Sequence, residues 1–126
     1  MRRFSSGAAF LIAWATAAPP AHGQKATERY VPLGQSPGAS GKLTSIGEIA
    51  EADARERTLT IAEPAGRRTL KITEKTKIYL DRSKLKQTNL TGSFADLQKG
   101  RRVEVKYEDA ALKQAADWIK VEITQP

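Results

Sequence analysis

The chain has 126 residues, with 21 Lys and Arg, 14 Asp and Glu, and a formal net charge of +7. It contains no Cys, one Met and one His, so the composition excludes a disulfide-stapled scaffold and offers almost no soft ligand for a metal ion. The length suits one small domain with a single hydrophobic core.

The first 23 residues have the pattern of a secretory signal peptide. Arg2 and Arg3 form a charged start, an apolar run covers 8–18, and residues 21–23 (Ala-His-Gly) form a small-x-small cleavage site. The apolar run is far shorter than the ~20 residues that a membrane span needs. We therefore expect cleavage after residue 23, a periplasmic or secreted protein, and a mature form without a transmembrane segment.

Residues 24–41 show neither the period of a strand nor that of a helix, and they are interrupted by Pro and Gly. This pattern predicts an extended or disordered arm, in which Tyr30, Val31 and Leu33 form one apolar knot. Two roles are open for the arm. Its apolar side chains could dock loosely on the domain, or the segment could recognise a partner.

A first strand is predicted over 43–49, where strict alternation fails around Gly47 and a bulge or sharp bend is expected. The runs 58–61 and 69–73 alternate on either side of a turn at 63–66, which predicts a hairpin. Because side chains alternate between the two faces of a strand, one face of this hairpin should carry Leu59, Ile61, Leu70 and Ile72.

The next strand is predicted over 76–81, where Ile78 and Leu80 continue the inward row of the hairpin. Residues 82–92 are polar and show no period, so we predict a loop. Leu85 and Leu90 are the residues that could tether this loop to the core.

The stretch SFADLQKG, residues 93–100, predicts one or two helical turns. Ser93 and Asp96 have the spacing of a capping box. In this arrangement the side chain of each residue accepts a hydrogen bond from the backbone N–H of the other. Phe94 and Leu97 lie on one side of such a helix, and Gly100 can take the left-handed conformation that ends it.

Two alternating runs over 102–107 and 117–123 complete the predicted sheet, with inward Val103, Val105, Tyr107, Ile119, Val121 and Ile123. A mainly β domain of five to six antiparallel strands with one short helix is typical of a small OB-like barrel. We therefore predict one such domain over 42–126.

Four stretches of the domain, GEIAEADARERTLTI, ITEKTKIYLD, SFADLQKGRRVEVKY and AADWIKVEIT, resemble the DUF5666 family of small exported bacterial proteins of unknown function. The resemblance covers about residues 43–124. It rests on turn, cap and core positions, so it implies an OB-like barrel and export. It implies no activity, cofactor or site residue.

Once the signal is removed, the mature chain contains no His, Cys or Met. We therefore predict no cofactor and no soft metal as a partner, because soft metals and zinc need those side chains. The acidic residues between 48 and 56 lack the spacing of a calcium loop and are expected to form a solvated face.

Nucleophilic catalysis without His or Cys would have to use carboxylates and lysines, and no pair of these lies in a recognisable motif. A carboxylate pair that meets only in the folded chain is the catalytic alternative. We predict a protein that is not an enzyme.

Positive charge is concentrated between residues 67 and 86, where eight Lys and Arg stand against Glu74 and Asp81. The strand pattern directs Lys71, Lys77 and Tyr79 outward, and it places Trp118 and Lys120 outward on the last strand. A basic sheet face with aromatic rings is therefore predicted. Its candidate binding residues are Lys71, Lys75, Lys77, Tyr79, Arg82, Lys84, Lys86, Trp118 and Lys120.

OB barrels commonly bind extended polymers on one sheet face, with cations for charge and aromatic rings for stacking. Exported proteins seldom meet nucleic acid, so the expected partner is an anionic glycan, lipopolysaccharide or the headgroups of a membrane surface. The alternatives are an envelope protein that pairs with the arm, and a set of lysines that only keeps the strands soluble.

Overall fold

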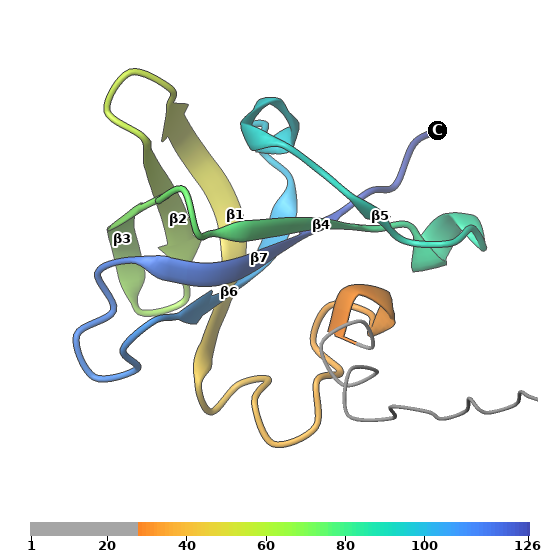
Figure 1. The fold of residues 1–126 in the computed structure, drawn as a ribbon, viewed down its shortest axis with the longest axis horizontal. Coiled ribbons are helices and arrows are strands. Elements are labelled where there is room, and N and C mark those ends of the chain that lie inside the picture. Colours follow the sequence, from red (N-terminus) through yellow and green to blue (C-terminus); the bar gives the residue numbers. More distant parts are fainter. Residues whose placement is uncertain (1–27) are drawn as a thin grey trace, which may run out of the picture.

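The structure is a computed structural model that describes residues 28–126. The predicted signal peptide and residues 24–27 lie outside this range. Seven strands form a single sheet (Figure 1). They are β1 (Thr44–Asp53), β2 (Thr58–Glu63), β3 (Gly66–Lys71), β4 (Lys77–Asp81), β5 (Leu90–Thr91), β6 (Arg102–Tyr107) and β7 (Ala116–Glu122), with short 3-10 helices η4 (Ser83–Leu85) and η5 (Phe94–Asp96).

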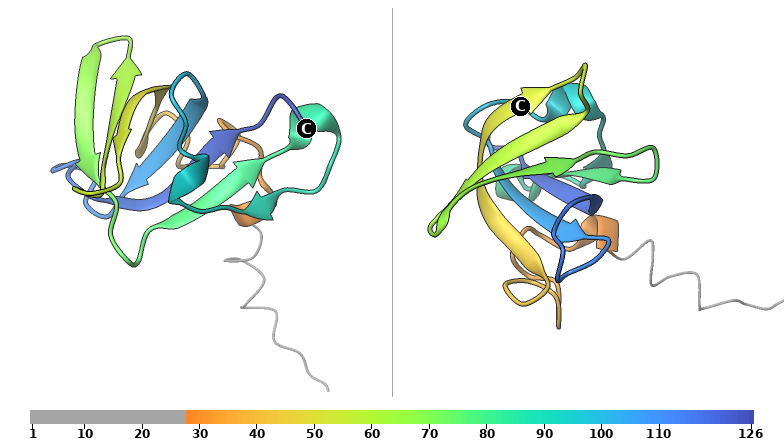
Figure 2. Two further views of the ribbon diagram at one scale, coloured as in Figure 1. Left: turned by 90° about the horizontal axis from the view of Figure 1, so that it is seen from above. Right: turned by 90° about the vertical axis from the view of Figure 1, so that its left-hand side faces the viewer.

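The sheet has the strand order β3-β2-β1-β6-β7-β4-β5 and curls into a barrel (Figures 1 and 2). The first half of β1 pairs with β6 and its second half with β2, so β1 takes part in both sides of the curl. At the seam, a bridge between Lys71 and Ala115 brings the end of β3 against the start of β7. The predicted OB-like barrel is confirmed.

Two details of the predicted sheet are corrected. There are seven strands among residues 28–126 rather than five or six, and β4 pairs with β7 in the parallel sense. β3 and β4 follow each other along the chain, and β7 runs beside both of them at the seam. β4 therefore keeps the parallel direction relative to β7 that the end of β3 has there. Strand alternation does not reveal strand direction, so the sequence gives no signal for it.

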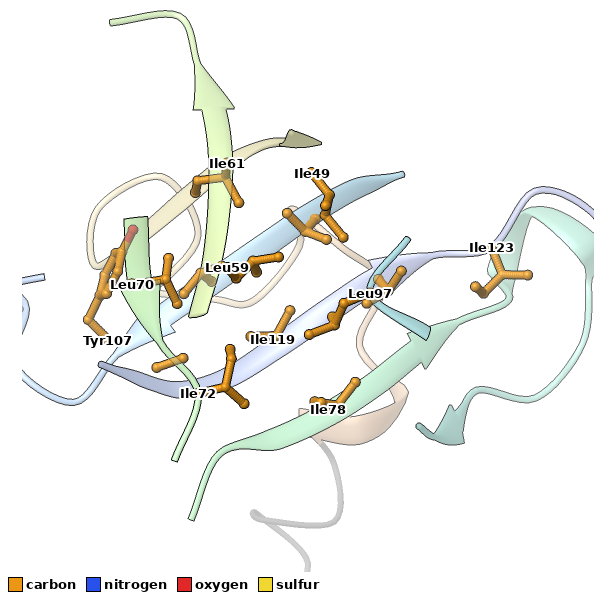
Figure 3. Close-up of a cluster of buried hydrophobic side chains, with 14 residues drawn as sticks. Ile49, Leu59, Ile61, Leu70, Ile72, Ile78, Leu97, Tyr107, Ile119 and Ile123 are labelled. Atoms are coloured by element: carbon orange, nitrogen blue, oxygen red, sulfur yellow. The ribbon is translucent and has the colours of Figure 1, made fainter. Parts of the chain in front are cut away.

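The hydrophobic core lies inside the barrel (Figure 3). Leu59, Ile61, Val103, Val105, Ile119 and Val121 are completely buried, as their strand phases predict. Leu97 of the chain that follows η5 is buried beside them, and Phe94 packs against the same cluster. The capping arrangement is present, since the Ser93 N–H donates to the Asp96 carboxylate at 2.8 Å.

Gly47 has a different role from the predicted bulge. The register shift of β1 occurs between Ile49 and Glu51, not at Gly47. At Gly47 the main chain of β2 passes so closely that a Cβ would lie 2.3 Å from the carbonyl oxygen of Ala62. The absence of a side chain therefore permits the crossing at which β1 leaves β6 and joins β2.

Ionisation of the Tyr107 hydroxyl makes the stability of the folded protein depend on pH. Its hydroxyl donates to Ser45 Oγ at 2.9 Å, and both residues are buried. Burial raises the pKa of the Tyr107 hydroxyl above its ordinary value. The folded state thus holds this proton more tightly than the unfolded state, so the stabilisation is present below about pH 10 and is lost as the pH rises through the folded-state pKa.

We expect Tyr107→Phe to lose less stability than the parent protein between about pH 8 and about pH 11, because the variant cannot titrate at this position. At neutral pH it should be less stable by about 1 kcal/mol, since Ser45 loses its partner. Urea unfolding across this range measures both effects. Tyr30→Phe, which removes an exposed phenol, is the control. An unchanged alkaline loss in Tyr107→Phe would contradict the assignment.

Residues 28–41, which we call the strap, begin with a helical turn at 28–30, continue as turns and pack on the outside of the sheet (Figure 1, orange). The predicted extended or disordered arm is therefore corrected for the part of it that lies in the structure. Gly34, Gly38 and Gly41 have positive φ and curl the segment, while Leu33 and Ser36 are buried.

Among residues 28–126, no helix is long and apolar enough to cross a membrane.

Candidate functional site

Buried carboxylates of the barrel hold the strap through its main chain. Glu104 of β6 is completely buried, and its two oxygens accept from the Gly34 N–H and the Thr44 hydroxyl, each at 2.8 Å. Asp81, at the end of β4, accepts from the Leu33 N–H at 2.9 Å. The N–H groups of turn residues have no partner in a strand ladder or a helix. Here acidic side chains on the facing strands accept hydrogen bonds from them.

Lys120 of β7 fixes the start of the strap, and we call its contacts the latch. The side chain is 1% exposed, and its ammonium group donates to Ser36 Oγ at 2.8 Å. The same Nζ lies 2.5 Å from Glu28 Oε2, which also accepts from Ser36 at 2.6 Å. The Trp118 ring, 4.7 Å from this Nζ, adds a cation–π contact.

The strap corrects the predicted exposure of three candidate residues. Tyr79, Trp118 and Lys120 are on the outer face, as predicted, but they are only 7%, 6% and 1% exposed. The alternation of side chains along each strand predicts correctly that these residues lie on the outer face. It does not predict whether they contact solvent. The strap covers this part of the sheet, and no local pattern in the strands indicates that another segment lies over them.

The other six candidates differ in their surroundings. Lys71, Lys75, Lys77, Lys84 and Lys86 are exposed, and Arg82 is half-buried. Several have partners within the protein: Arg82 Nε donates to the Thr88 carbonyl at 2.7 Å, and Lys84 pairs with Glu122 at 3.3 Å. Of the nine predicted residues, the structure brings Lys77 and Tyr79 together in one hollow of the described surface.

This hollow, which we call the β4 groove, has a volume of about 930 Å³. It runs between β4 with its preceding turn, the segment from β5 to η5, and the start of the strap. Its lining residues are Arg29, Tyr30, Arg57, Ile72, Thr73, Glu74, Thr76, Lys77, Ile78, Tyr79, Thr91, Gly92, Ser93, Phe94 and Ala95.

The β4 groove combines aromatic rings with cations. The Arg57 guanidinium lies 5.0 Å from the Phe94 ring, and that of Arg29 lies 5.2 Å from the Tyr30 ring. Lys77 is a third cation, whereas one carboxylate, that of Glu74, lines the groove. The sequence did not indicate Arg29, Arg57 or Phe94 as site residues, because they come from segments far apart in the chain.

Tyr79 supplies a hydroxyl that stays protonated. Burial raises the pKa of this phenol above its ordinary value, and the negative charge of Glu28 acts in the same direction. A neutral phenol both donates and accepts hydrogen bonds. The groove therefore presents a neutral polar group beside its positive charges.

The groove contains few acidic side chains. Two-carboxylate hydrolysis needs a pair of acids, and the lining contains one. Between residues 28 and 126 there is no group of three or more His, Cys, Asp or Glu side chains placed to hold a metal ion. Cations and aromatic rings of this kind can orient an anionic ligand.

No family model matches the chain, and no curated protein matches it. Two solved structures do. A Cu(II) structure of a Trp-to-Ala variant of CusF, residues 10–88, from Escherichia coli shares 15% identity and a TM-score of 0.45, covering 63% of this chain and 89% of that one. The Ag(I) form of CusF shares 16% identity and a TM-score of 0.43, covering 62% and 93%.

These matches overturn one prediction. The sequence predicts no soft-metal partner, whereas the two matched structures are of a protein that holds copper or silver. The prediction of no soft metal is therefore withdrawn. The matches assign no metal-binding residue to this chain.

Proposed function

We propose that this protein is a non-enzymatic, exported binding module that holds an anionic glycan in the β4 groove. The observation that carries the proposal is the combination of Arg29, Arg57 and Lys77 with three aromatic rings in one hollow. Export is supported by the signal-peptide pattern of residues 1–23 and by the resemblance to the exported DUF5666 family.

A glycan suits both components of the groove. The faces of sugar rings are apolar and pack on aromatic side chains, while acidic substituents pair with Arg and Lys. A volume of about 930 Å³ is large enough for more than one sugar ring. Glu74 and the Tyr79 hydroxyl offer hydrogen-bond partners for sugar hydroxyls.

The alternative of an arm that pairs with an envelope protein has less support. Strand addition requires free main-chain donors and acceptors. In the strap, the Leu33 and Gly34 N–H groups already donate to Asp81 and Glu104. The arm would have to leave the barrel before it could offer these groups to a partner.

We expect Lys77→Gln to weaken binding of an acidic oligosaccharide about fivefold at low salt, because each cation near an anionic ligand contributes about 1 kcal/mol. The effect should fade as salt rises. The measurement is a titration of nitrogen-15-labelled protein, in which groove amides such as those of Thr73, Thr91 and Phe94 should shift.

Lys86→Gln is the matched control, because it removes the same charge from an exposed lysine outside the groove. It should leave the affinity within about twofold of the parent. Equal losses in the two variants would place binding on the general basic surface rather than in the groove. Absence of shifts in the parent protein with any acidic oligosaccharide would refute the proposed function.

A further inference from the structure

Arg29 has hydrogen-bonding capacity that the described part of the protein does not use. Its Nε is buried and has no hydrogen-bond partner among residues 28–126, and the side chain lines the β4 groove. No salt bridge of those residues includes its guanidinium. A shielded donor without an acceptor is costly, and an acceptor on a ligand would remove this cost.

The surroundings of Arg29 hold it in one place. Its carbonyl oxygen accepts from Asn89 Nδ2 at 3.3 Å, and its guanidinium lies over the Tyr30 ring at 5.2 Å. The residue before it, Glu28, is bound by the latch through Lys120 and Ser36. The main chain before and after Arg29 is thus held by the latch and by Asn89.

We propose that Arg29 binds a carboxylate of the ligand in the β4 groove, and that the buried Lys120 is the positioning residue that holds Arg29 there. This inference rests on the proposed function and narrows it to a glycan that contains uronic acid or another carboxylate-bearing sugar. A guanidinium matches a carboxylate by two parallel hydrogen bonds, one of which can use Nε. Lys77 then contributes charge without this geometry, because its ammonium group acts as a point charge.

Lys120 does not line the groove and acts through the strap. Its ammonium group is buried, so it needs the Glu28 carboxylate and the Ser36 hydroxyl in place. If the latch opens, the start of the strap is free to move and carries Arg29 and Tyr30 out of the groove wall. The position of the Arg29 guanidinium therefore depends on the Lys120 ammonium group, which lies on the covered face of β7.

The first test compares a uronic-acid oligosaccharide with its carboxyl-reduced, neutral counterpart. At a salt concentration that screens the exposed Lys77 and Arg57, the parent should bind the acidic chain about tenfold more tightly, and Arg29→Gln should bind the two equally, with its affinity for the neutral chain unchanged. Arg55→Gln, which removes an exposed arginine outside the groove, should keep the preference. Retention of the preference in Arg29→Gln would overturn the assignment.

The second test examines the latch without a ligand. In Lys120→Met, amide hydrogen exchange at Leu33 and Gly34 should rise about tenfold, and the preference for the acidic chain should be lost although Arg29 is intact. Lys106→Met is the control, because Lys106 pairs with Asp117 on the same two strands without touching the strap. Ser36→Ala removes one latch contact from the strap side and should raise exchange about threefold. Unchanged exchange in both latch variants would overturn the positioning role.

Acetate separates this inference from the proposed function. As a small carboxylate, it should shift the Arg29 Nε–H resonance more than that of Arg55, whether or not a saccharide binds. A shift with acetate and none with the oligosaccharides would refute the glycan and retain Arg29 as a carboxylate site. No selective shift with acetate would overturn the inference, even if the oligosaccharides bind.

Discussion

Gly47→Ala should lower the free energy of unfolding by about 4 kcal/mol or more, because the added methyl group has no space. Its Cβ would lie 2.3 Å from the Ala62 carbonyl oxygen and 3.0 Å from the Ala62 carbonyl carbon, both of which belong to the main chain of β2. A side chain could rotate away, but the main chain can move only if β2 separates from β1. Urea unfolding followed by circular dichroism measures the loss.

Gly38→Ala provides the comparison for Gly47→Ala. Gly38 has a φ of +75° and no atom within 4 Å of an added Cβ, so the variant introduces backbone strain without a clash. Its cost should be about 1–2 kcal/mol, as for other residues in the left-handed region. If Gly47→Ala costs no more than Gly38→Ala, the contact between β1 and β2 does not restrict residue 47.

Glu104→Leu should destabilise the protein by about 3 kcal/mol, since it removes the acceptor of two hydrogen bonds from a fully buried position. The Gly34 N–H and the Thr44 hydroxyl lose their partner. Glu104 also stands opposite Lys120 in the β6–β7 ladder, so the variant removes a negative charge next to a buried ammonium group. Urea unfolding measures the loss of stability.

Two variants separate these contributions. Glu104→Gln keeps an acceptor for the Gly34 N–H, whereas the oxygen that faces the Thr44 hydroxyl becomes an NH2 group and the charge is lost, so its cost should be about 1 kcal/mol. Glu108→Leu makes the same change at an exposed position beyond the end of β6 and should remain within about 0.5 kcal/mol of the parent. A urea midpoint for Glu104→Leu equal to that of the parent would show that the strap does not depend on this carboxylate.

The strand phases, the capping of η5 and the barrel class could be predicted because each depends on local patterns. Val103 and Val105 alternate with polar neighbours, and the spacing of Ser93 and Asp96 is contained within one turn. Burial of apolar area fixes which face of each strand points inward, and that is the strongest signal in a short β sequence. The two-residue β5 is too short to show a period, so its range was predicted as a loop.

The cover over the outer face and the β4 groove could not be predicted, because both depend on contacts between distant segments. Lys120 and Trp118 have the phase of solvent-facing residues, and only the strap makes them buried. Glu104 has an ordinary polar position between two valines, and its partner Gly34 lies 70 residues away. Alternation gives the face of a residue, whereas a second layer of chain over that face leaves no local pattern.

The strap also constrains the order in which the protein assembles. Its contacts join Leu33 to Asp81, Gly34 to Glu104 and Ser36 to Lys120, over separations of 48, 70 and 84 residues. Although the strap precedes the barrel in the chain, it has no surface to dock on until β7, the last strand, is in place. Contacts of such long range form late in folding. Weakening them, as in Glu104→Leu, should therefore speed unfolding in stopped-flow experiments and leave the folding rate nearly unchanged.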